Sequence, residues 1–329
     1  MSHSNISIFV PHLGCPNQCS FCNQNHITGF QILPGKNDVD DAVKIAVSSK
    51  KYDNKDCEIA FFGGSFTAID KSYMIELLSV ASQYVEKGIV SGIRISTRPD
   101  CIDKEVLLLL KKYNVTAIEL GAQSMCDDVL LANKRGHSAS DAHEASLLIK
   151  EFGFELGLQM MTGLYKSDFD KDLYTAKEII KLSPDTVRIY PTIILKNTPL
   201  GELYLRGEYK TYSLEDTIKL CSKLVLMFEE NNINVIRLGL HTVDNNAYLG
   251  GPWHPAFSEL CSAEIFKRKI DEQIHNKGNY ELIINSADTS KAAGHKRSNL
   301  IYFENKGIFL KIIKDDLIEK NKLLIREVN

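Results

Sequence analysis

Residues 13–24 of the chain read LGCPNQCSFCNQ, and Cys15, Cys19 and Cys22 have the spacing Cys-x3-Cys-x2-Cys. Three thiols so close together are more typical of a metal or redox site than of a disulfide framework when a protein lies in a reducing compartment. An apolar segment precedes the cysteines. The stretch therefore predicts a metal-binding loop that directly follows a strand.

Two kinds of metal site fit this spacing. A structural zinc site normally has four Cys or His ligands, and His12 and His26 flank the loop. An iron–sulfur cube held by three thiolates leaves one iron open to a substrate or cofactor. The spacing alone leaves both alternatives open. The other cysteines are scattered singly, and we expect each to be a small buried apolar side chain: Cys57, Cys101, Cys126, Cys221 and Cys261.

The composition is that of an ordinary globular protein. The chain has 329 residues, of which 44 % are hydrophobic and 25 % are charged. No apolar run approaches the ~20 residues that span a bilayer, and the N-terminus lacks the pattern of a signal peptide. We therefore expect a cytoplasmic protein without a membrane partner, in which the thiols stay reduced.

The charge balance does not by itself indicate nucleic-acid binding. The net charge is −3 and the isoelectric point about 6.3, so the chain has no overall basic field. Short basic segments occur at residues 133–137, 266–269 and 294–299. The cations of these segments are Lys134, Arg135, Lys267, Arg268, Lys269, Lys296 and Arg297.

Short apolar runs alternate with amphipathic helical patterns along most of the chain. The expected helices include residues 37–49, 138–153 and 213–231, which begin with capping signals. The expected strands are mostly apolar on both faces, as in buried parallel sheets. These strands cover residues 6–12, 58–64, 92–97, 117–123, 155–161 and 186–192. The alternation predicts an α/β fold, either a parallel barrel or a doubly wound sheet.

Polar and glycine-rich segments follow each expected strand. They are the cysteine loop, GGSFT, TRPD, QS, MTG and YPT, in this order. In α/β barrels the active site lies at the carboxyl ends of the strands, so these segments predict one site at one rim. The pattern changes beyond residue 277, and we expect a core at residues 1–277 and a small C-terminal appendage at residues 278–329.

Seven motifs carry a resemblance to a known family. They read GCPNQCSFC, FFGGSFT, TRPD, ELGAQSMCDDVL, KRGHS, IYPT and YKTY. In this order they resemble the radical S-adenosylmethionine (SAM) enzymes, in particular the radical SAM domain of the Elongator complex catalytic subunit. A more distant similarity is to oxygen-independent coproporphyrinogen oxidase. The resemblance implies a partial (β/α)6 TIM-like barrel, here followed by the small α/β appendage.

The resemblance also implies the cofactors. Cys15, Cys19 and Cys22 would hold a [4Fe–4S] cluster, and SAM would take the fourth iron, which explains three cysteines rather than four. One electron from a reductase, a flavodoxin or a ferredoxin would cleave SAM to methionine and a 5′-deoxyadenosyl radical. The cofactor supplies the difficult chemistry, while the protein orients and shields it.

Position by position, the resemblance assigns contacts to SAM. Relatives often carry Glu where this chain has Ser96, which accepts a hydrogen bond but brings no charge. The implied cofactor-binding residues are Gly63, Gly64, Ser96, Gln123, Arg135 and Gln159. Arg135 would pair with the SAM carboxylate, because an arginine fork suits a carboxylate.

Tyr190 and His254 are the candidate catalytic side chains. Tyr190 ends the sixth expected strand and would face the same rim. Residues 250–257 read GGPWHPAF, and this turn would cap the mouth of the barrel with Trp253 and His254. An interdomain turn is the alternative interpretation of the segment.

We expect this protein to have neither the acetyltransferase domain nor the basic N-terminal extension of the Elongator subunit. A separate protein would then supply any acyl group, or the radical chemistry would differ. We expect a radical SAM enzyme that modifies tRNA or a nucleoside. The alternatives are a radical SAM enzyme for a small metabolite and a non-catalytic module that binds a metal or a partner.

Overall fold

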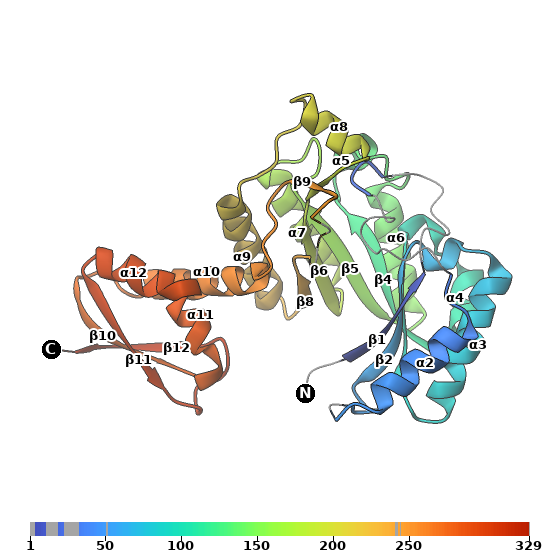
Figure 1. Ribbon diagram of the computed structural model, residues 1–329, viewed down its shortest axis with the longest axis horizontal. Coiled ribbons are helices and arrows are strands. Elements are labelled where there is room, and N and C mark those ends of the chain that lie inside the picture. The colour runs from blue at the N-terminus through green and yellow to red at the C-terminus, as the bar shows by residue number, and fades with distance from the viewer. Residues whose placement is uncertain are drawn as a thin grey trace.

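The largest unit of the molecule is a curled sheet of seven parallel strands (Figure 1). The computed structural model describes residues 4–10, 19–22, 33–50, 52–240, 243 and 245–328. The strand order is β1-β2-β3-β4-β5-β6-β8, and each neighbouring pair is parallel. The strands are β1 (Ser4–Val10), β2 (Cys57–Gly63), β3 (Gly92–Thr97), β4 (Val115–Gln123), β5 (Glu155–Thr162), β6 (Thr186–Pro191) and β8 (Asn234–Leu238).

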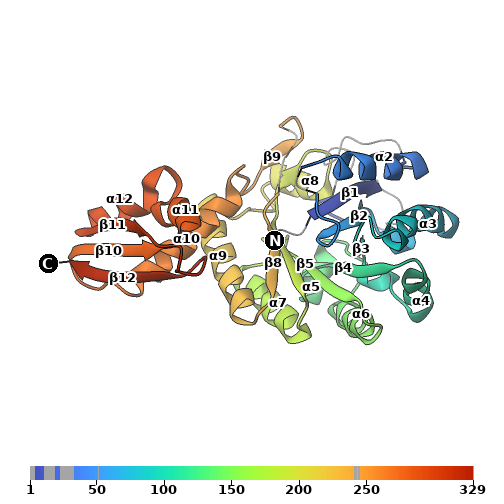
Figure 2. The same cartoon turned by 90° about the horizontal axis from the view of Figure 1, so that it is seen from below.

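This sheet confirms the partial barrel that the sequence predicts. The six expected strands are β1 to β6, and β8 adds a seventh that the sequence analysis missed. Figure 2 shows the strands as an arc with the helices along its outer side. The helices of this unit are α2 (Lys36–Val47), α3 (Lys71–Glu86), α4 (Lys104–Lys112), α5 (Asp127–Ala132), α6 (Ala139–Glu151), α7 (Phe169–Leu182), α8 (Pro199–Leu205), α9 (Leu214–Glu230) and α10 (Phe257–Asp271).

Side-chain caps fix where several helices begin. At the start of α6, Ser138 Oγ accepts a hydrogen bond from Asp141 N, while Ser138 N donates to Asp141 Oδ2. This reciprocal capping box is the signal that the sequence carries at this point. At the start of α9, Ser213 Oγ likewise accepts a hydrogen bond from Asp216 N. Among the described residues, no helix is long and apolar enough to cross a membrane.

The two faces of the sheet differ in chemistry. The outer face packs on the helices through one large apolar cluster that includes Ile59, Ile95 and Leu120. The inner face carries charged side chains at alternate positions of the same strands, because successive side chains point to opposite faces. The expectation that both faces are apolar is therefore wrong for the inner face.

The inner face is stabilised by paired charges. Arg94 Nε donates to Glu58 Oε2 and Arg94 Nη2 donates to Glu155 Oε1, both at 2.8 Å. Arg188 Nη2 donates to Glu119 Oε1 at 2.7 Å, and Arg94 Nη1 lies 3.6 Å from the same oxygen. Arg94 is 2 % exposed and Glu119 is 1 % exposed. Buried charges persist in proteins when they are paired in this way.

A small second sheet lies at the C-terminal end of the chain. Its strand order is β11-β10-β12, in which β10 pairs parallel with β11 and antiparallel with β12. Its apolar cluster includes Phe266 and Ile270 of α10 as well as Leu282 and Phe303. The elements are β10 (Gly278–Ile284), α11 (Thr289–Ala293), α12 (Ser298–Asn305), β11 (Ile308–Lys314) and β12 (Leu323–Val328). The division of the chain at residues 277 and 278 stays a prediction.

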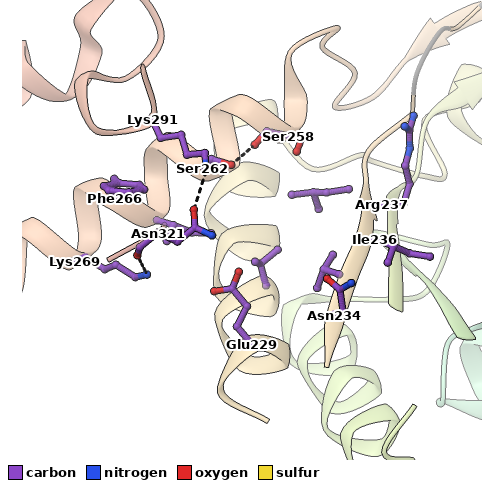
Figure 3. A pocket seen from close by; sticks show the side chains of 14 residues that line it. Glu229, Asn234, Ile236, Arg237, Ser258, Ser262, Phe266, Lys269, Lys291 and Asn321 are labelled. Carbon is purple, nitrogen blue, oxygen red and sulfur yellow. Dashed lines mark hydrogen bonds between the residues drawn. The ribbon is translucent and has the colours of Figure 1, made fainter. Parts of the chain in front are cut away.

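A cavity of about 230 Å³ marks the seam between the barrel edge and the C-terminal appendage (Figure 3). Strand β8 and helix α9 form one side, and Lys269, Lys291 and Asn321 lie on the other. Lys269 Nζ donates to Asn321 O and Lys291 Nζ donates to Asn321 Oδ1. The pairing on β8 is interrupted next to Arg188, and such irregularities blunt a sheet edge. We therefore interpret this cavity as part of the structural contact between the barrel and the appendage.

The β5–α7 loop is organised around one buried carboxyl group. Asp172 is 2 % exposed. Its Oδ2 accepts from Gly163 N at 2.9 Å, its Oδ1 accepts from Ser167 Oγ at 2.6 Å, and Tyr212 of the YKTY motif donates to Oδ2 at 3.2 Å. Burial raises the pKa of Asp172 to about 6 despite these donors.

The inner-face charges predict a large loss of stability when Arg94 is removed. Arg94→Met leaves the buried carboxylate of Glu58 and the partly exposed carboxylate of Glu155 without this cation. Removal of one partner of a buried ion pair costs about 3–5 kcal/mol. The free energy of unfolding from urea titration measures this loss. Lys71→Met is the control, because the Lys71–Glu105 pair is exposed and should change stability by less than about 1 kcal/mol. Equal effects of the two substitutions would contradict the assignment.

Asp172 predicts a pH dependence of stability. Its pKa in the folded protein is about 6, above the ordinary 3.8, so the native state holds this proton more tightly than the unfolded chain does. The stability that the proton contributes is complete below about pH 4 and is lost as the pH rises through 6. Over this range, wild type should lose about 2–3 kcal/mol more than Asp172→Asn does. The exposed Asp170 of the same helical turn provides the control substitution, Asp170→Asn, which should retain the wild-type slope.

Candidate functional site

The described part of the cysteine loop lies at the carboxyl-end rim of the sheet. Cys19 is 5 % exposed, and Cys22 is half-buried. Cys15, together with His12 and His26, lies outside the described residues. Among the described residues, no group of three Cys, His, Asp or Glu side chains is arranged to hold a metal ion. The third thiol of the predicted cluster site therefore stays a prediction.

The loop is held from two sides. Ser20 N donates to Asn133 O at 3.1 Å, and Ser20 Oγ donates to Asn133 Oδ1 at 2.7 Å. On the other side, Leu200 N of α8 donates to Ser20 O at 2.8 Å. Phe21 packs in an apolar cluster with Tyr165, Leu200 and Tyr209. The last of these is the first tyrosine of the YKTY motif, which thereby acquires a role in supporting the loop.

Arg135 lies directly against Cys19. Its Nη1 donates to Cys19 Sγ at 3.1 Å, and its Nη2 donates to Gly121 O at 2.6 Å. The side chain is 7 % exposed, and its Nε has no partner within the described residues. The arginine that the sequence singled out thus reaches the cysteine loop and is not a surface residue.

The irregular end of β4 makes this approach feasible. Gly121 and Ala122 pair with neither β3 nor β5, and Gln123 has a φ of 65°. The carbonyl oxygens of these two residues are therefore available to side chains. Gly121 O accepts from Arg135, and Ala122 O lies 3.1 Å from His137 Nε2. Burial and then Arg135 lower the pKa of His137 to about 4, so its imidazole is neutral at pH 7.

The space that a side chain at Gly121 would take up, here called the cradle, is filled by the ends of two predicted site residues. A Cβ at this position would lie 2.9 Å from Gln123 Nε2 and 3.4 Å from Arg135 Nη2. The predicted residues Gln123 and Arg135 therefore meet over one glycine. Gln123 Oε1 is buried and has no hydrogen-bond partner among the described residues.

The two glycines after β2 are tied to the end of β1. Gly63 has a φ of 124°, and a Cβ there would lie 2.3 Å from Val10 O. Gly64 N donates to the same carbonyl oxygen at 3.0 Å. The need for glycine at position 63 thus has a structural cause in the close approach of β1. Any contact of these glycines with SAM stays a prediction.

The sequence analysis missed a hydroxyl network that joins the second and third rim loops. Ser65 Oγ lies 2.8 Å from Thr97 Oγ1, and Thr67 Oγ1 lies 2.6 Å from the same atom. Arg98 pairs with Asp100 through two hydrogen bonds of 2.9 and 2.8 Å, while its buried Nη1 has no partner within the described residues. The sequence analysis singled out the segments GGSFT and TRPD, but it did not predict the hydrogen bonds that their side chains make.

Ser96 and Gln159 meet on the inner face, below the rim. Gln159 Nε2 lies 3.5 Å from Ser96 Oγ and donates to Glu119 Oε2 at 3.0 Å. Gln159 therefore links the Glu119 carboxylate to Ser96, the position where relatives often carry Glu. The charge that Ser96 lacks is present on the neighbouring strand, although Arg188 neutralises it.

The two candidate catalytic residues lie apart. Burial raises the pKa of Tyr190, whose side chain lies beside Arg188 on the inner face of β6. His254 Nδ1 accepts from Ala256 N at 3.0 Å, and its ring packs at 5.9 Å from the ring of His295 in the C-terminal appendage. None of these contacts of His254 reaches Cys19 or Arg135. The turn that carries His254 and Trp253 thus joins the barrel to the appendage.

The residues at the rim fit the implied cofactors. Thiolates are the ligands of iron–sulfur clusters, and two of the three cysteines of the motif are described here. Four buried polar atoms beside them lack partners among the described residues, although such atoms are usually satisfied in native proteins. They are Arg98 Nη1, Gln123 Oε1, Arg135 Nε and His137 Nδ1. Such a set suits a bound molecule that has a carboxylate and hydroxyl groups.

Comparison with protein families identifies two regions of the chain. Residues 9–176, just over half of the chain, match the family model of the Radical SAM superfamily. Residues 184–267 match the model of the Radical_SAM C-terminal domain. The first match begins at the end of β1 and ends within α7, and the second begins just before β6 and ends within α10.

Two curated relatives show which named proteins the chain resembles in sequence. The tRNA uridine(34) acetyltransferase of Methanocaldococcus jannaschii is 39 % identical over 132 residues, which are 39 % of this chain and 24 % of that protein. Elongator complex protein 3 of Homo sapiens is 30 % identical over 190 residues, which are 52 % of this chain and 35 % of that protein. The chain therefore spans only about a quarter to a third of the length of these relatives.

The solved structure supports the fold. It is the archaeal Methanocaldococcus infernus Elp3 with an N-terminal deletion, which superposes with a TM-score of 0.64 at 21 % identity. The superposition covers 82 % of this chain and 64 % of that one. At this identity the likeness shows the curled α/β half-barrel alone.

The cradle over Gly121 yields a prediction for ligand binding. Gly121→Ala places a methyl group against the ends of two flexible side chains rather than against backbone, so the melting temperature should change little. The methyl group should displace Gln123 and Arg135 and weaken SAM binding about tenfold, which corresponds to one charge-assisted hydrogen bond. Calorimetric titration of reconstituted protein with SAM measures this change. Unchanged affinity together with an unchanged melting temperature would remove the cradle from the binding site.

Proposed function

Because the chain belongs to the radical SAM superfamily, we propose that it binds a [4Fe–4S] cluster, cleaves SAM and uses the radical to modify a nucleoside of tRNA. The observation that carries the cofactor part is the contact between Arg135 and Cys19. A buried guanidinium beside a cysteine of the motif, surrounded by unpartnered polar atoms, suits a SAM molecule bound next to a cluster.

In this proposal, different residues of the chain hold the cluster, bind SAM and contact the substrate. Cys15, Cys19 and Cys22 hold the cluster, which supplies one electron to the bound sulfonium. Arg135 pairs with the SAM carboxylate, because its fork carries a fixed positive charge. The other proposed SAM contacts are Gly63, Gly64, Ser96, Gln123 and Gln159. The half-buried Tyr190, whose raised pKa keeps it protonated, is a candidate for contact with the substrate, as is His254.

The substrate part of the proposal is supported by the names of the relatives. One is named for acetyl transfer to tRNA uridine 34, and the match to it covers only 24 % of its length. We propose tRNA or a nucleoside as the substrate, a separate protein as the source of any acyl group, and a reductase, flavodoxin or ferredoxin as the electron donor.

The basic segments differ in their availability to an RNA phosphate. Lys267 and Arg268 are both paired with Glu264, and Lys267 also lies 5.2 Å from the centre of the Tyr302 ring. By contrast, the exposed side chains of Lys296 and Arg297 make no hydrogen bond or ion pair with the rest of the described chain. Because the ring of His295 packs against that of His254, Lys296 and Arg297 follow directly on a residue that contacts the turn at residues 250–257. Lys296 and Arg297 are therefore the proposed phosphate contacts.

The experiment that tests the proposed function is an anaerobic assay for 5′-deoxyadenosine. Reconstituted protein should cleave SAM when reduced, and bulk tRNA should yield a new nucleoside by mass spectrometry. Replacing Cys15, Cys19 and Cys22 by Ala should abolish both results and remove the iron. Stoichiometric zinc without iron after anaerobic purification would overturn the proposal in favour of a structural site. SAM cleavage without any tRNA product would favour a small metabolite.

RNA binding provides a second prediction. Lys296 and Arg297 have φ values of 50° and 64°, and Asn tolerates this backbone conformation. The double variant Lys296→Asn/Arg297→Asn should weaken tRNA binding and lower the salt slope by roughly one unit per lost phosphate contact. Substrate-free SAM cleavage should be unaffected.

The matched control replaces two cations that are already paired. Lys267→Gln/Arg268→Gln removes the same formal charge from the surface and should leave the salt slope close to that of wild type. Absence of salt-dependent tRNA binding by wild type at ~50 mM salt, where phosphate contacts are strongest, would exclude the RNA part of the proposal.

A further inference from the structure

We propose that Asn133 is a positioning residue that sets the register between the cysteine loop and Arg135. The inference rests on the proposed function, since it concerns the environment of the cluster. In the sequence, Asn133 is the first residue of the basic segment 133–137. No contact with a cofactor is assigned to it. In the structure it is fully buried and connects three separate segments of the rim.

The contacts of Asn133 use its whole amide group. Its Oδ1 accepts from Ser20 Oγ at 2.7 Å, and its backbone oxygen accepts from Ser20 N at 3.1 Å. Its Nδ2 donates to Val129 O at 2.8 Å and to Tyr165 O at 2.9 Å. Helix α5, the β5–α7 loop and the cysteine loop therefore meet at this one side chain.

Asparagine suits this place because it offers an acceptor and two donors on a short side chain. Aspartate would keep the acceptor for Ser20 but would set a carboxylate oxygen against the carbonyl groups of Val129 and Tyr165. Alanine would leave the Ser20 hydroxyl and both carbonyl groups without this partner. Unsatisfied buried polar groups destabilise their surroundings, so either change should loosen the loop.

Two adjacent contacts form a short ladder between the cysteine loop and the turn after α5. Ser20 pairs with Asn133, and its neighbour Cys19 contacts Arg135. The turn between Asn133 and Arg135 is itself anchored on α5, because Lys134 N donates to Leu131 O and Arg135 N donates to Leu130 O, both at 3.0 Å. The Ser20–Asn133 pair therefore fixes the position of the cysteine loop relative to Arg135, and so the contact between the guanidinium and the Cys19 sulfur.

This register has a consequence for a bound cluster. Hydrogen bonds to the sulfur atoms and exposure to solvent both set the reduction potential of an iron–sulfur cluster. Loss of the Ser20–Asn133 pair, here called the latch, should draw Arg135 away from Cys19 and so remove a hydrogen bond to the sulfur, which lowers the reduction potential. Partners of metal ligands typically change metal affinity by 10–100-fold when they are removed, so the effect should be measurable without any turnover.

The test compares three variants of the full chain after anaerobic reconstitution. Asn133→Ala removes the whole latch, and Ser20→Ala removes only the hydroxyl donor. Asn231→Ala is the matched control, because Asn231 also ends a helix and bonds a carbonyl oxygen four residues earlier, at Met227, but is exposed. The readouts are the rate of iron release to a chelator and the cluster potential from a redox titration monitored by electron paramagnetic resonance.

Asn133→Ala should release iron about tenfold faster than wild type and should shift the potential to a more negative value. Ser20→Ala should shift both readouts in the same direction by less, and Ser20→Thr, which keeps the hydroxyl, should restore them. Asn231→Ala should match wild type. If Asn133→Ala fails to fold, the comparison of Ser20→Ala with Ser20→Thr still decides.

Two failures are distinguishable. A wild-type protein that binds no cluster overturns the proposed function and leaves nothing for the latch to position. A wild-type protein that holds its cluster, together with Ser20→Ala and Asn133→Ala variants that keep the wild-type potential and iron-release rate, overturns the role of Asn133 alone.

Discussion

The half-barrel depends on the pairing of charges that its strands bury on their inner face. Arg94 reaches from β3 to carboxylates on both sides, Glu58 and Glu155, while Arg188 neutralises Glu119. An unpaired charge at such depth would cost far more than one hydrogen bond contributes. The pairs therefore hold β2 to β6 in one register, and the register decides which residues emerge at the rim. The apolar outer face drives the sheet to bury itself, but the ionic inner face determines how the strands align.

The candidate site is built where the sheet stops being regular. Gly121 and Ala122 leave the ladder at the end of β4, and their carbonyl oxygens receive Arg135 and His137 instead of strand partners. A perfectly paired strand could not offer these acceptors, because its backbone groups would already be bonded. The local irregularity thus converts backbone into a binding surface for side chains. It also explains why a glycine stands there: a larger residue would push Gln123 and Arg135 out of their places.

Sequence reasoning located the rim but not the partnerships within it. The strands β1 to β6 were predictable, because their apolar runs and the punctuation after them follow the periodic rules of parallel α/β units. Strand β8 was missed, because its five residues NVIRL combine Asn and Arg with three apolar positions and give no clear alternation. Arg135 was singled out through its motif, and the structure shows that its side chain contacts Cys19. Asn133 and the Ser65–Thr97 pair had no local signature, since their partners lie 113 and 32 positions away.

The long reach of the Ser20–Asn133 pair has a consequence for how the protein is made. The cysteines leave the ribosome before the groups that hold their loop, which belong to Asn133 and Leu200. At about 5–20 residues per second, residue 200 follows the cysteines after roughly 10–40 s. During that interval the thiols are part of an unfinished chain and are open to metals and oxidants alike. The cysteine loop is therefore synthesised well before the residues that hold it, and a cluster can be bound in the finished site only after residue 200 has been added.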